Sequence, residues 1–273
     1  MPKKILLLFA ATASFTHAAT IGVNFLHNGT NPDDIAFGTA TAGVAPYAQG
    51  NWNFMATDWS GNGVNDAALT SLVTSTGAAV TNLLPITYGI HSDRVHYDSS
   101  NTYRSGIGNG SANNTLMNGY LDDASNNQPY INISLDNTVL NATIVLYIHG
   151  DATNGPVGRY WLEDWSDPIN EGTVITDQVG ISSNDYNGTF ISAGTYSQTG
   201  TPTNVDVATG NYIVFENITA NNIRIRGAGN GDPEDFGRAP INAFQLVTVP
   251  VPEPSTTALL GLGGLALVLR RRK

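Results

Sequence analysis

The C-terminal segment is the feature that most constrains the fold of this chain, because its pattern of apolar and charged residues does not fit inside a packed domain. An apolar run at residues 255–269 is followed by four cations at the very end, Arg270, Arg271, Arg272 and Lys273. Charges of this kind have no role in a hydrophobic core, whereas a membrane helix with cations on its cytoplasmic side explains both features. The run is shorter than the roughly 20 residues of an ordinary membrane span, and Pro252 and Pro254 resist its extension as helix. We therefore expect a transmembrane helix at residues 255–269 with a basic stop behind it.

Pro252, Glu253 and Pro254 precede the apolar run and the basic end. This order resembles the PEP-CTERM sorting signal of bacteria that build extracellular polysaccharide, and the three residues match the tripeptide of that family. The resemblance implies that an exosortase in the inner membrane cuts the chain near the tripeptide, so that the helix anchors the protein only transiently. It also implies that the protein then reaches the cell surface or the extracellular space, where extracellular polysaccharide is a candidate partner.

The N-terminal segment has the pattern of a secretory signal peptide. Lys3 and Lys4 precede an apolar stretch at residues 5–13, and small residues follow up to Ala18. A cationic start, a short apolar middle and small residues at the cut are typical of such signals. With cleavage placed after Ala18, the chain divides into a signal peptide at residues 1–18, an exported domain at residues 19–249 and a sorting signal at residues 250–273.

The exported domain is strongly acidic and has no cysteine. The two end segments contain six of the 12 Lys and Arg residues but only one of the 22 acids, Glu253. Six cations against 21 acids give the domain a formal charge of −15, compared with −10 for the whole chain. Such a charge argues against nucleic acid and anionic membrane surfaces as partners. Because no disulfide can support the fold, a hydrophobic core must stabilise it, and a domain of this length buries one.

The composition favours short strands over helices, because Asn, Gly, Thr and Ser are abundant and charged residues make up only 12% of the chain. The strongest strand is expected at residues 142–149, where both faces are largely apolar, which places it at the centre of a sandwich. Further strands are expected at residues 20–26, 69–75, 78–90, 157–163, 172–178, 189–196, 211–215, 222–227 and 241–249. Many short strands at regular spacing predict an all-β fold, an antiparallel β-sandwich or jelly roll.

Three details of the sandwich can also be predicted. Residues 76 and 77 have the pattern of a tight turn, and residues 66–73 fit a strand and a short helix equally well. The first strand is expected to pair near the last, which brings the two ends of the domain together. The strands at residues 211–215 and 222–227 are expected to form a hairpin with Ile223 and Ile225 pointing inward and Arg224 and Arg226 pointing outward.

Two stretches resemble an uncharacterised domain that is common in exported bacterial proteins of this kind. They are the opening, at residues 21–25, 42–46 and 51–53, and the closing strand at residues 238–247. The overall pattern is similar to that of galactose-binding-like jelly rolls. The resemblance therefore implies a galactose-binding-like sandwich and, by analogy of fold, a contact with sugars.

One loop makes Ca²⁺ the leading cofactor hypothesis. Asp58, Ser60 and Asn62 carry oxygen at the first, third and fifth positions of a pattern with Gly63 at the sixth. This is the beginning of an EF-hand loop, but the twelfth position is Leu69 instead of a bidentate Glu, which excludes a complete EF-hand. We expect at most one structural Ca²⁺, with Asp58, Ser60 and Asn62 as its candidate ligands, and no other cofactor.

Candidate ligand contacts come from tryptophans that follow an aspartate. Trp59 follows Asp58 and Trp165 follows Asp164; such a pair offers a ring to stack on a sugar and a carboxylate to bind its hydroxyls. Trp59, Trp165 and Asp164 are therefore the candidate ligand-binding residues, with packing in the core as the alternative. Glu163 and Asp164 are adjacent, so in a strand they face opposite sides, which disfavours a pair of glycosidase carboxylates. No catalytic residue is assigned.

These features predict an exported, non-catalytic protein of the cell surface or extracellular matrix, structural or associated with polysaccharide. The alternatives are a dedicated carbohydrate-binding, lectin-like module and a glycan-active enzyme. A single saturable sugar ligand would favour the module. Two convergent carboxylates in an aromatic cleft would favour the enzyme.

Overall fold

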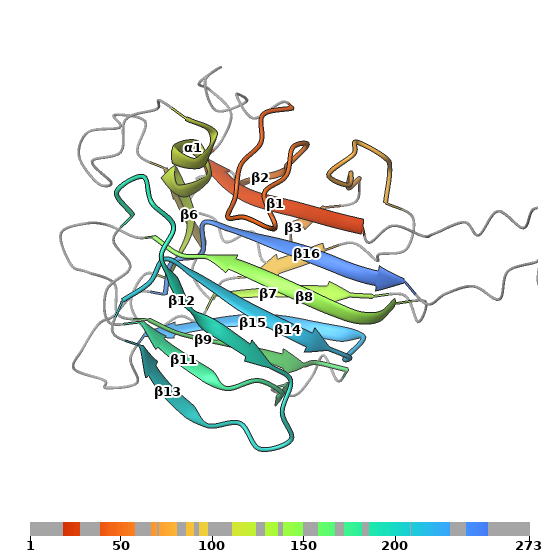
Figure 1. Cartoon of the computed structure of the whole chain (residues 1–273), viewed down its shortest axis with the longest axis vertical. Coiled ribbons are helices and arrows are strands. Elements are labelled where there is room, and N and C mark those ends of the chain that lie inside the picture. The colour runs from red at the N-terminus through yellow and green to blue at the C-terminus, as the bar shows by residue number, and fades with distance from the viewer. Residues whose placement is uncertain are drawn as a thin grey trace, which may run out of the picture.

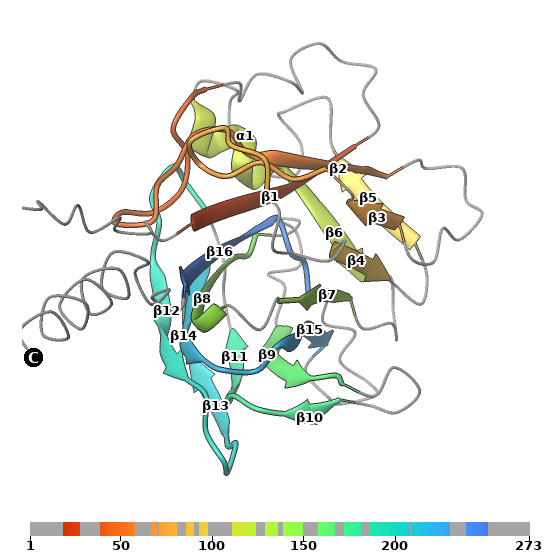
Figure 2. The ribbon, with the colours of Figure 1, turned by 90° about the vertical axis from the view of Figure 1, so that its right-hand side faces the viewer.

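The computed structural model describes residues 19–27, 39–57, 67–69, 71–80, 86–89, 93–97, 111–123, 129–135, 139–149, 158–166, 172–181, 186–207, 209–229 and 239–250. Most of these residues lie in β-strands, and the strands form two large sheets that face each other (Figure 1 and Figure 2). The all-β sandwich predicted from the sequence is therefore confirmed.

The first sheet contains the two ends of the domain. Its six strands are β1 (Ala19–His27), β2 (Asn53–Thr57), β8 (Val139–Tyr147), β12 (Ser192–Ser197), β14 (Tyr212–Ile218) and β16 (Ala243–Pro250). They lie side by side in the order β12-β14-β8-β16-β1-β2. The last strand of the chain, β16, is therefore an interior strand of this sheet.

The second sheet packs against the first. Its eight strands are β3 (Ala67–Leu69), β4 (Ile86–Gly89), β7 (Tyr130–Ser134), β9 (Gly158–Asp164), β10 (Thr173–Val174), β11 (Gln178–Ile181), β13 (Asn204–Val207) and β15 (Asn222–Gly229). Their order is β13-β11-β9-β15-β7-β4-β3, with β10 paired to β9. A separate two-stranded sheet joins β5 (Asp93–Tyr97) to β6 (Gly119–Asp123), and the helix α1 (Ala112–Asn118) leads directly into β6.

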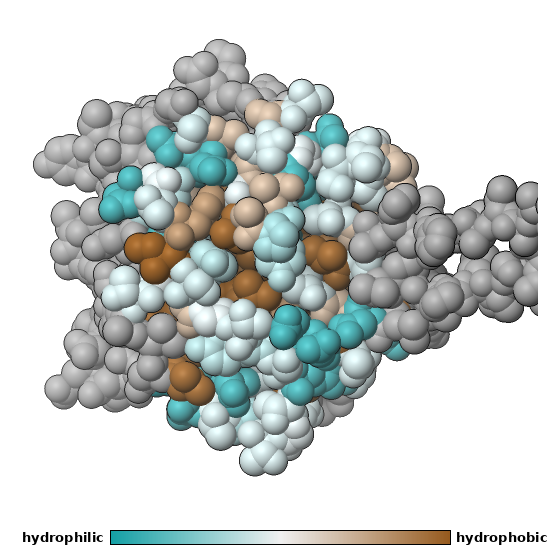
Figure 3. All heavy atoms as spheres, viewed as in Figure 1, coloured by the Kyte–Doolittle hydropathy of each residue, from teal (hydrophilic) through white to brown (hydrophobic). Residues whose placement is uncertain are grey.

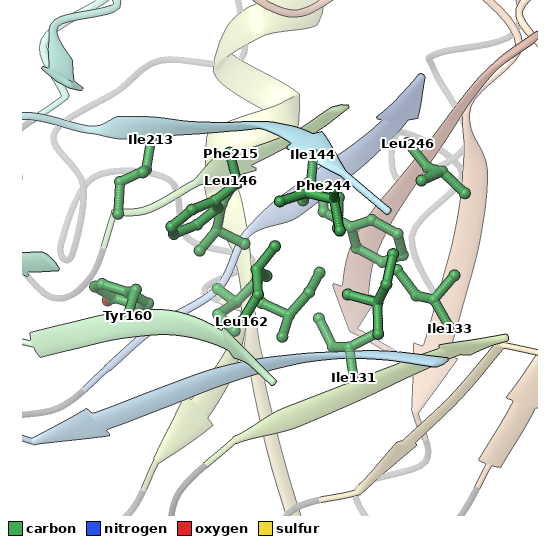
Figure 4. Close-up of a cluster of buried hydrophobic side chains, with 14 of the residues drawn as sticks. Ile131, Ile133, Ile144, Leu146, Tyr160, Leu162, Ile213, Phe215, Phe244 and Leu246 are labelled. Carbon is green, nitrogen blue, oxygen red and sulfur yellow. The ribbon is translucent and has the colours of Figure 1, made fainter. Parts of the chain in front are cut away.

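One hydrophobic core fills the space between the two sheets. The close-up in Figure 4 shows side chains of both sheets pointing toward each other: Ile131, Ile133, Tyr160 and Leu162 from the eight-stranded sheet, and Ile144, Leu146, Ile213, Phe215, Phe244 and Leu246 from the six-stranded sheet. All of these side chains are fully buried. They recur at every second residue, which is the period of a strand with one face on a core. Burial of this apolar surface stabilises a domain that has no disulfide.

The strand β8 is buried on both faces, as the sequence predicted. Ile144 and Leu146 face the core between the sheets, while Val145 and Tyr147 face the opposite side. That outer side is covered by α1 and by side chains from residues 42–54 and 186–190. The cover packs a second hydrophobic cluster around Tyr147, which includes Trp52, Leu116, Met117, Tyr186 and Val214.

Two fully buried asparagines fasten α1 to the six-stranded sheet. The Asn24 side chain donates to the carbonyl of Leu116 (2.9 Å). The Asn242 side chain donates to the carbonyls of Met117 and Gly119 (both 2.9 Å). The last carbonyls of a helix have no partner within the helix, so these two amides satisfy groups that would otherwise be buried without a hydrogen bond.

The first and last strands of the domain pair, as predicted, with Ala19 of β1 opposite Thr248 of β16. The sheets are not purely antiparallel, because β1 with β2, β11 with β13, and β12 with β14 are parallel pairs. The path of the chain explains the last two pairs. The chain alternates between the two sheets from β11 to β14, so each return to a sheet runs in the same direction as the strand before.

The predicted hairpin at residues 211–215 and 222–227 is wrong. β14 belongs to the six-stranded sheet and β15 to the eight-stranded sheet, and residues 219–221 carry the chain from one to the other. Both strands point apolar side chains into the same core. The alternation of apolar and polar residues is therefore the same whether the two strands form a hairpin in one sheet or lie in two different sheets. The side-chain directions are as predicted: Ile223 and Ile225 are fully buried, and Arg224 and Arg226 alternate with them on the outer face.

The predicted tight turn is present. The N–H of Gly77 donates to the carbonyl of Thr74 (2.8 Å), and Gly77 has a φ of 80°, which favours glycine. In place of two long flanking strands, the described residues beside the turn form an isolated bridge between Val73 and Ala79. A strand and a short helix were both predicted for residues 66–73; of these, residues 67–69 form the strand β3.

Candidate functional site

The predicted sorting signal begins where the sandwich ends. β16 runs to Pro250, which lies opposite Val139 of β8, and β1 begins at Ala19, which lies opposite Thr248. The predicted signal-peptide cut and the predicted sorting signal therefore meet at one end of the six-stranded sheet, where the β16 arrow ends in Figure 1. We call this the tail-proximal end and define it by Ala19, Val139 and Pro250.

The sorting signal itself lies outside the described residues: Pro252, Glu253, Pro254, the apolar run at residues 255–269, and Arg270, Arg271, Arg272 and Lys273. Among the ranges that the structure does describe, no helix combines the length and the hydropathy needed to cross a bilayer. The transmembrane helix at residues 255–269 stays a prediction.

The candidate ligand residues Trp165 and Asp164 lie at the end of β9. The half-buried Trp165 donates its indole N–H to the carbonyl of Ile223 (3.1 Å). The guanidinium of Arg224 lies over its ring, 5.4 Å from the ring centre, and 5.2 Å from the ring centre of Tyr130. The Asp164 side chain accepts a hydrogen bond from the backbone N–H of Ser166 (3.2 Å). Arg224 thus occupies a face of Trp165 on which a sugar would stack.

Both arginines of β15 pair with one buried carboxylate, Glu163. Arg226 approaches it at 3.4 Å and Arg224 at 3.9 Å, and the indole N–H of Trp161 donates to it at 2.8 Å. Burial lowers the pKa of Arg224, and the neighbouring Glu163 carboxylate acts in the opposite direction. Glu163 is only 4% exposed, so its charge is matched by the two guanidinium groups.

The other predicted site residues lie outside the described residues. These are Trp59 and the candidate calcium ligands Asp58, Ser60 and Asn62. Within the described ranges, no three acidic or histidine side chains come together as a metal site requires. The calcium site stays a prediction.

A cleft that the sequence did not indicate lies beside β1 and β16. It has a volume of about 470 Å³ and is lined by uncharged residues: Thr20, Thr41, Pro46, Tyr47, Ala48, Gln49, Gly50, Ser75 and Val247. Figure 3 views the molecule from the side of the six-stranded sheet, where apolar and polar residues are interspersed. The cleft residues come from four distant parts of the chain, so no local motif connects them.

Hydrogen bonds to the sheet hold one wall of the cleft. The Gln245 side chain donates to the carbonyl of Tyr47 (2.6 Å). The hydroxyl of Tyr147 donates to Gln245 (2.5 Å) and accepts from the N–H of Val44 (3.0 Å). Burial raises the pKa of Tyr147, so this hydroxyl keeps its proton at neutral pH. The wall is therefore fixed before any ligand arrives.

Because Gly22 has no side chain, the residues of this wall can pack closely against β1. A methyl group at Gly22 would meet the Gln49 side chain and would come within 2.6 Å of the Trp52 ring. We expect Gly22→Ala to lower the unfolding free energy by about 1–3 kcal/mol, the usual cost of overpacking. Gly200→Ala is the matched control, because nothing lies within 4 Å of its added methyl group. Urea unfolding of both variants tests this, and equal stabilities would contradict it.

The comparison with known families concerns the end of the chain. The family model of the PEP-CTERM protein-sorting motif matches residues 250–273, starting at the last residue of β16. No curated protein matches the chain. The match confirms the tripeptide, apolar run and basic end as one signal, of the kind that exosortases process. The chain therefore carries a PEP-CTERM protein-sorting motif, which supports an exported protein that an exosortase sorts.

Proposed function

We propose that this protein is a non-catalytic component of the cell surface or extracellular matrix, anchored transiently in the inner membrane before its tail is removed. The observation that carries the proposal is the position of the motif, directly behind the last strand of the sandwich. The apolar run at residues 255–269 would hold the chain in the bilayer, and the four terminal cations would stay in the cytoplasm. Cleavage near Pro252, Glu253 and Pro254 would then release the sandwich to associate with extracellular polysaccharide.

The intact mass of the exported protein tests this proposal. In a host with the exosortase, the mature protein should lack residues 1–18 and the segment from the cut near Pro252 to Lys273. In the same host without the exosortase, the protein should keep Arg270–Lys273 and pellet with membranes. A soluble, released product that still contains Lys273 would overturn the proposal.

The cleft beside β1 and β16 supports a second candidate function, a carbohydrate-binding, lectin-like module. Its lining offers hydroxyl groups from Thr20, Thr41 and Ser75 and the ring of Tyr47, with no charged side chain. Hydroxyls that hydrogen-bond and a ring that stacks are the groups that recognise a neutral sugar. We propose this cleft, rather than Trp59 or Trp165, as the site of such binding.

Saturation-transfer NMR with glucose, galactose, mannose and N-acetylglucosamine tests the second candidate. We expect at least one of these sugars to bind, and Tyr47→Ala to weaken that binding by roughly tenfold, which corresponds to about 1.4 kcal/mol. Tyr196 lies on β12, the edge strand of the same sheet on the side away from the cleft. Tyr196→Ala is therefore the control and should leave binding unchanged. No binding by any sugar, or equal binding by Tyr47→Ala, would contradict it.

A glycan-active enzyme is the weakest candidate. A glycosidase needs two carboxylates across a cleft, and the buried Glu163 is engaged by Arg224 and Arg226. We therefore propose no catalytic residue. A structural Ca²⁺ held by Asp58, Ser60 and Asn62 stays compatible with each of the candidate functions.

A further inference from the structure

The outer face of the six-stranded sheet has one acidic side chain among its described residues, Glu216 of β14. The six strands, α1 and the covering residues 42–54 and 186–190 contain no other Asp, Glu, Lys or Arg. Glu216 is partly exposed, and within the described ranges no arginine forms an ion pair with it. Glu216 therefore differs from the buried Glu163, because the described part of the domain supplies no cation to match its charge.

The strand register brings Tyr47 close to this carboxylate. Gln245 of β16, Val145 of β8 and Val214 of β14 lie opposite one another on three adjacent strands (Figure 1). The Gln245 side chain donates to the carbonyl of Tyr47 (2.6 Å), which holds Tyr47 above the first of these strands. Glu216 lies two residues after Val214, so its side chain is on the same outer face. Tyr47 packs on that face as well, against the cluster that contains Val145 and Val214.

Tyr212 completes a group of three side chains, Tyr47, Tyr212 and Glu216, which we call the tyrosine–carboxylate cluster. Tyr212 lies two residues before Val214 and packs against the same outer cluster, with its ring centre 6.3 Å from that of Phe190. Burial raises the pKa of Tyr47, and the charges of Glu216 and Tyr212 raise it further. Such an electrostatic effect requires both groups to lie near the Tyr47 hydroxyl. The cluster therefore brings two aromatic rings and a carboxylate together.

Two aromatic rings beside a carboxylate have the chemistry that binds an ammonium group. The face of a tyrosine ring attracts a cation, and a carboxylate accepts hydrogen bonds from an ammonium that are stronger than those between neutral groups. A neutral sugar has no group that matches the charge of Glu216. The formal charge of −15 on the exported domain also attracts a cationic ligand and repels an anionic one.

We propose that the ligand of the cleft beside β1 and β16 is an amino sugar with a free ammonium group, which the tyrosine–carboxylate cluster holds. This inference rests on the second candidate function, in which the cleft binds a carbohydrate. Tyr47 connects the two parts of the site, because it lines the cleft and belongs to the cluster. The hydroxyl groups of the cleft bind those of the sugar, while Glu216 pairs with the nitrogen. The ligand class is therefore a polysaccharide of hexosamines whose nitrogen is not acetylated.

Calorimetric titration of the exported protein with two disaccharides tests this inference. One is made of glucosamine and the other of N-acetylglucosamine, so they differ only in the acetyl groups. In a mildly acidic buffer that protonates the amine, we expect the glucosamine disaccharide to bind roughly tenfold more tightly, because only it forms the charged pair. Glu216→Gln should remove this preference and leave binding of the acetylated disaccharide unchanged. In the natural protein, a basic buffer that neutralises the amine should remove the preference as well.

Asp177→Asn is the matched control, because it removes the same charge from the other sheet. Asp177 precedes β11 and accepts from the N–H and the hydroxyl of Thr203 (2.8 and 2.9 Å), and the side-chain oxygen of asparagine can keep both bonds. This variant should keep the preference for the glucosamine disaccharide. An equal loss of preference in Asp177→Asn and Glu216→Gln would mean that the total charge attracts the ligand, and it would overturn the inference.

The other outcomes separate this inference from the function on which it rests. Equal binding of the two disaccharides, or a preference that survives in Glu216→Gln, would overturn the amino-sugar ligand and leave a carbohydrate-binding cleft. A lysine dipeptide that binds as tightly as the glucosamine disaccharide would show that the cluster recognises ammonium without a sugar, which also overturns it. Binding of neither disaccharide would overturn the inference, and the absence of binding by the neutral sugars as well would overturn the second candidate function.

Discussion

Replacing Pro252, Glu253 and Pro254 together by alanine should leave the chain uncut and bound to the membrane. Alanine favours helix where proline prevents it, so the apolar helix would extend toward Pro250 and remove the extended backbone that a protease binds. Three recognition contacts of about 1 kcal/mol each correspond to a roughly hundredfold slower cut. Intact mass and membrane fractionation measure the result in a host with exosortase.

A control changes two residues just beyond the tripeptide. Thr256→Ala with Thr257→Ala keeps the two prolines and the glutamate and makes the run slightly more apolar. This control should be cut at the normal rate. Normal cutting of the triple-alanine variant would show that the tripeptide is not the recognised element.

Asn242→Ala should destabilise the domain by at least about 3 kcal/mol. The Asn242 side chain donates to the carbonyls of Met117 and Gly119 (2.9 Å) and accepts from the backbone N–H of His149. Alanine leaves these three buried groups without their partner, at about 1–3 kcal/mol for each. Since domains are stable by only about 5–15 kcal/mol, the variant should unfold at a much lower urea concentration.

Asn204→Ala provides the control for this prediction. Asn204 is an exposed asparagine at the start of β13, and substitutions at such positions usually change stability by less than about 0.5 kcal/mol. Circular dichroism during urea unfolding compares the two variants. An unchanged midpoint for Asn242→Ala would mean that the contact between α1 and the sheet contributes little to stability.

The class of fold could be predicted because its signals are local. Ile144 and Leu146 alternate with Val145 and Tyr147 within one short run, and that run alone indicates a strand buried on both faces. The turn at Gly77 is equally local. The sorting signal was found for the same reason, since its tripeptide, apolar run and cations follow one another directly in the sequence.

The features that could not be predicted depend on pairing between distant residues. Ile223 and Ile225 would face the core in a hairpin or after a crossing, so the sheet to which β15 belongs was not determined by its own sequence. Asn24 and Asn242 do not differ in type from the many other asparagines of this chain. The cleft needs Thr20, Tyr47, Ser75 and Val247 in one place, and only the completed sheet brings them together.

The place of β16 makes the order of synthesis matter. This strand fills the gap between β1 and β8, yet it is the last part of the domain to leave the translocation channel when the N-terminus emerges first. Before its arrival, the first and the middle portions of the chain cannot join into one sheet, and closing such a long loop is slow. We therefore expect the six-stranded sheet to be completed only once β16 has left the channel, when the sorting motif follows directly behind it.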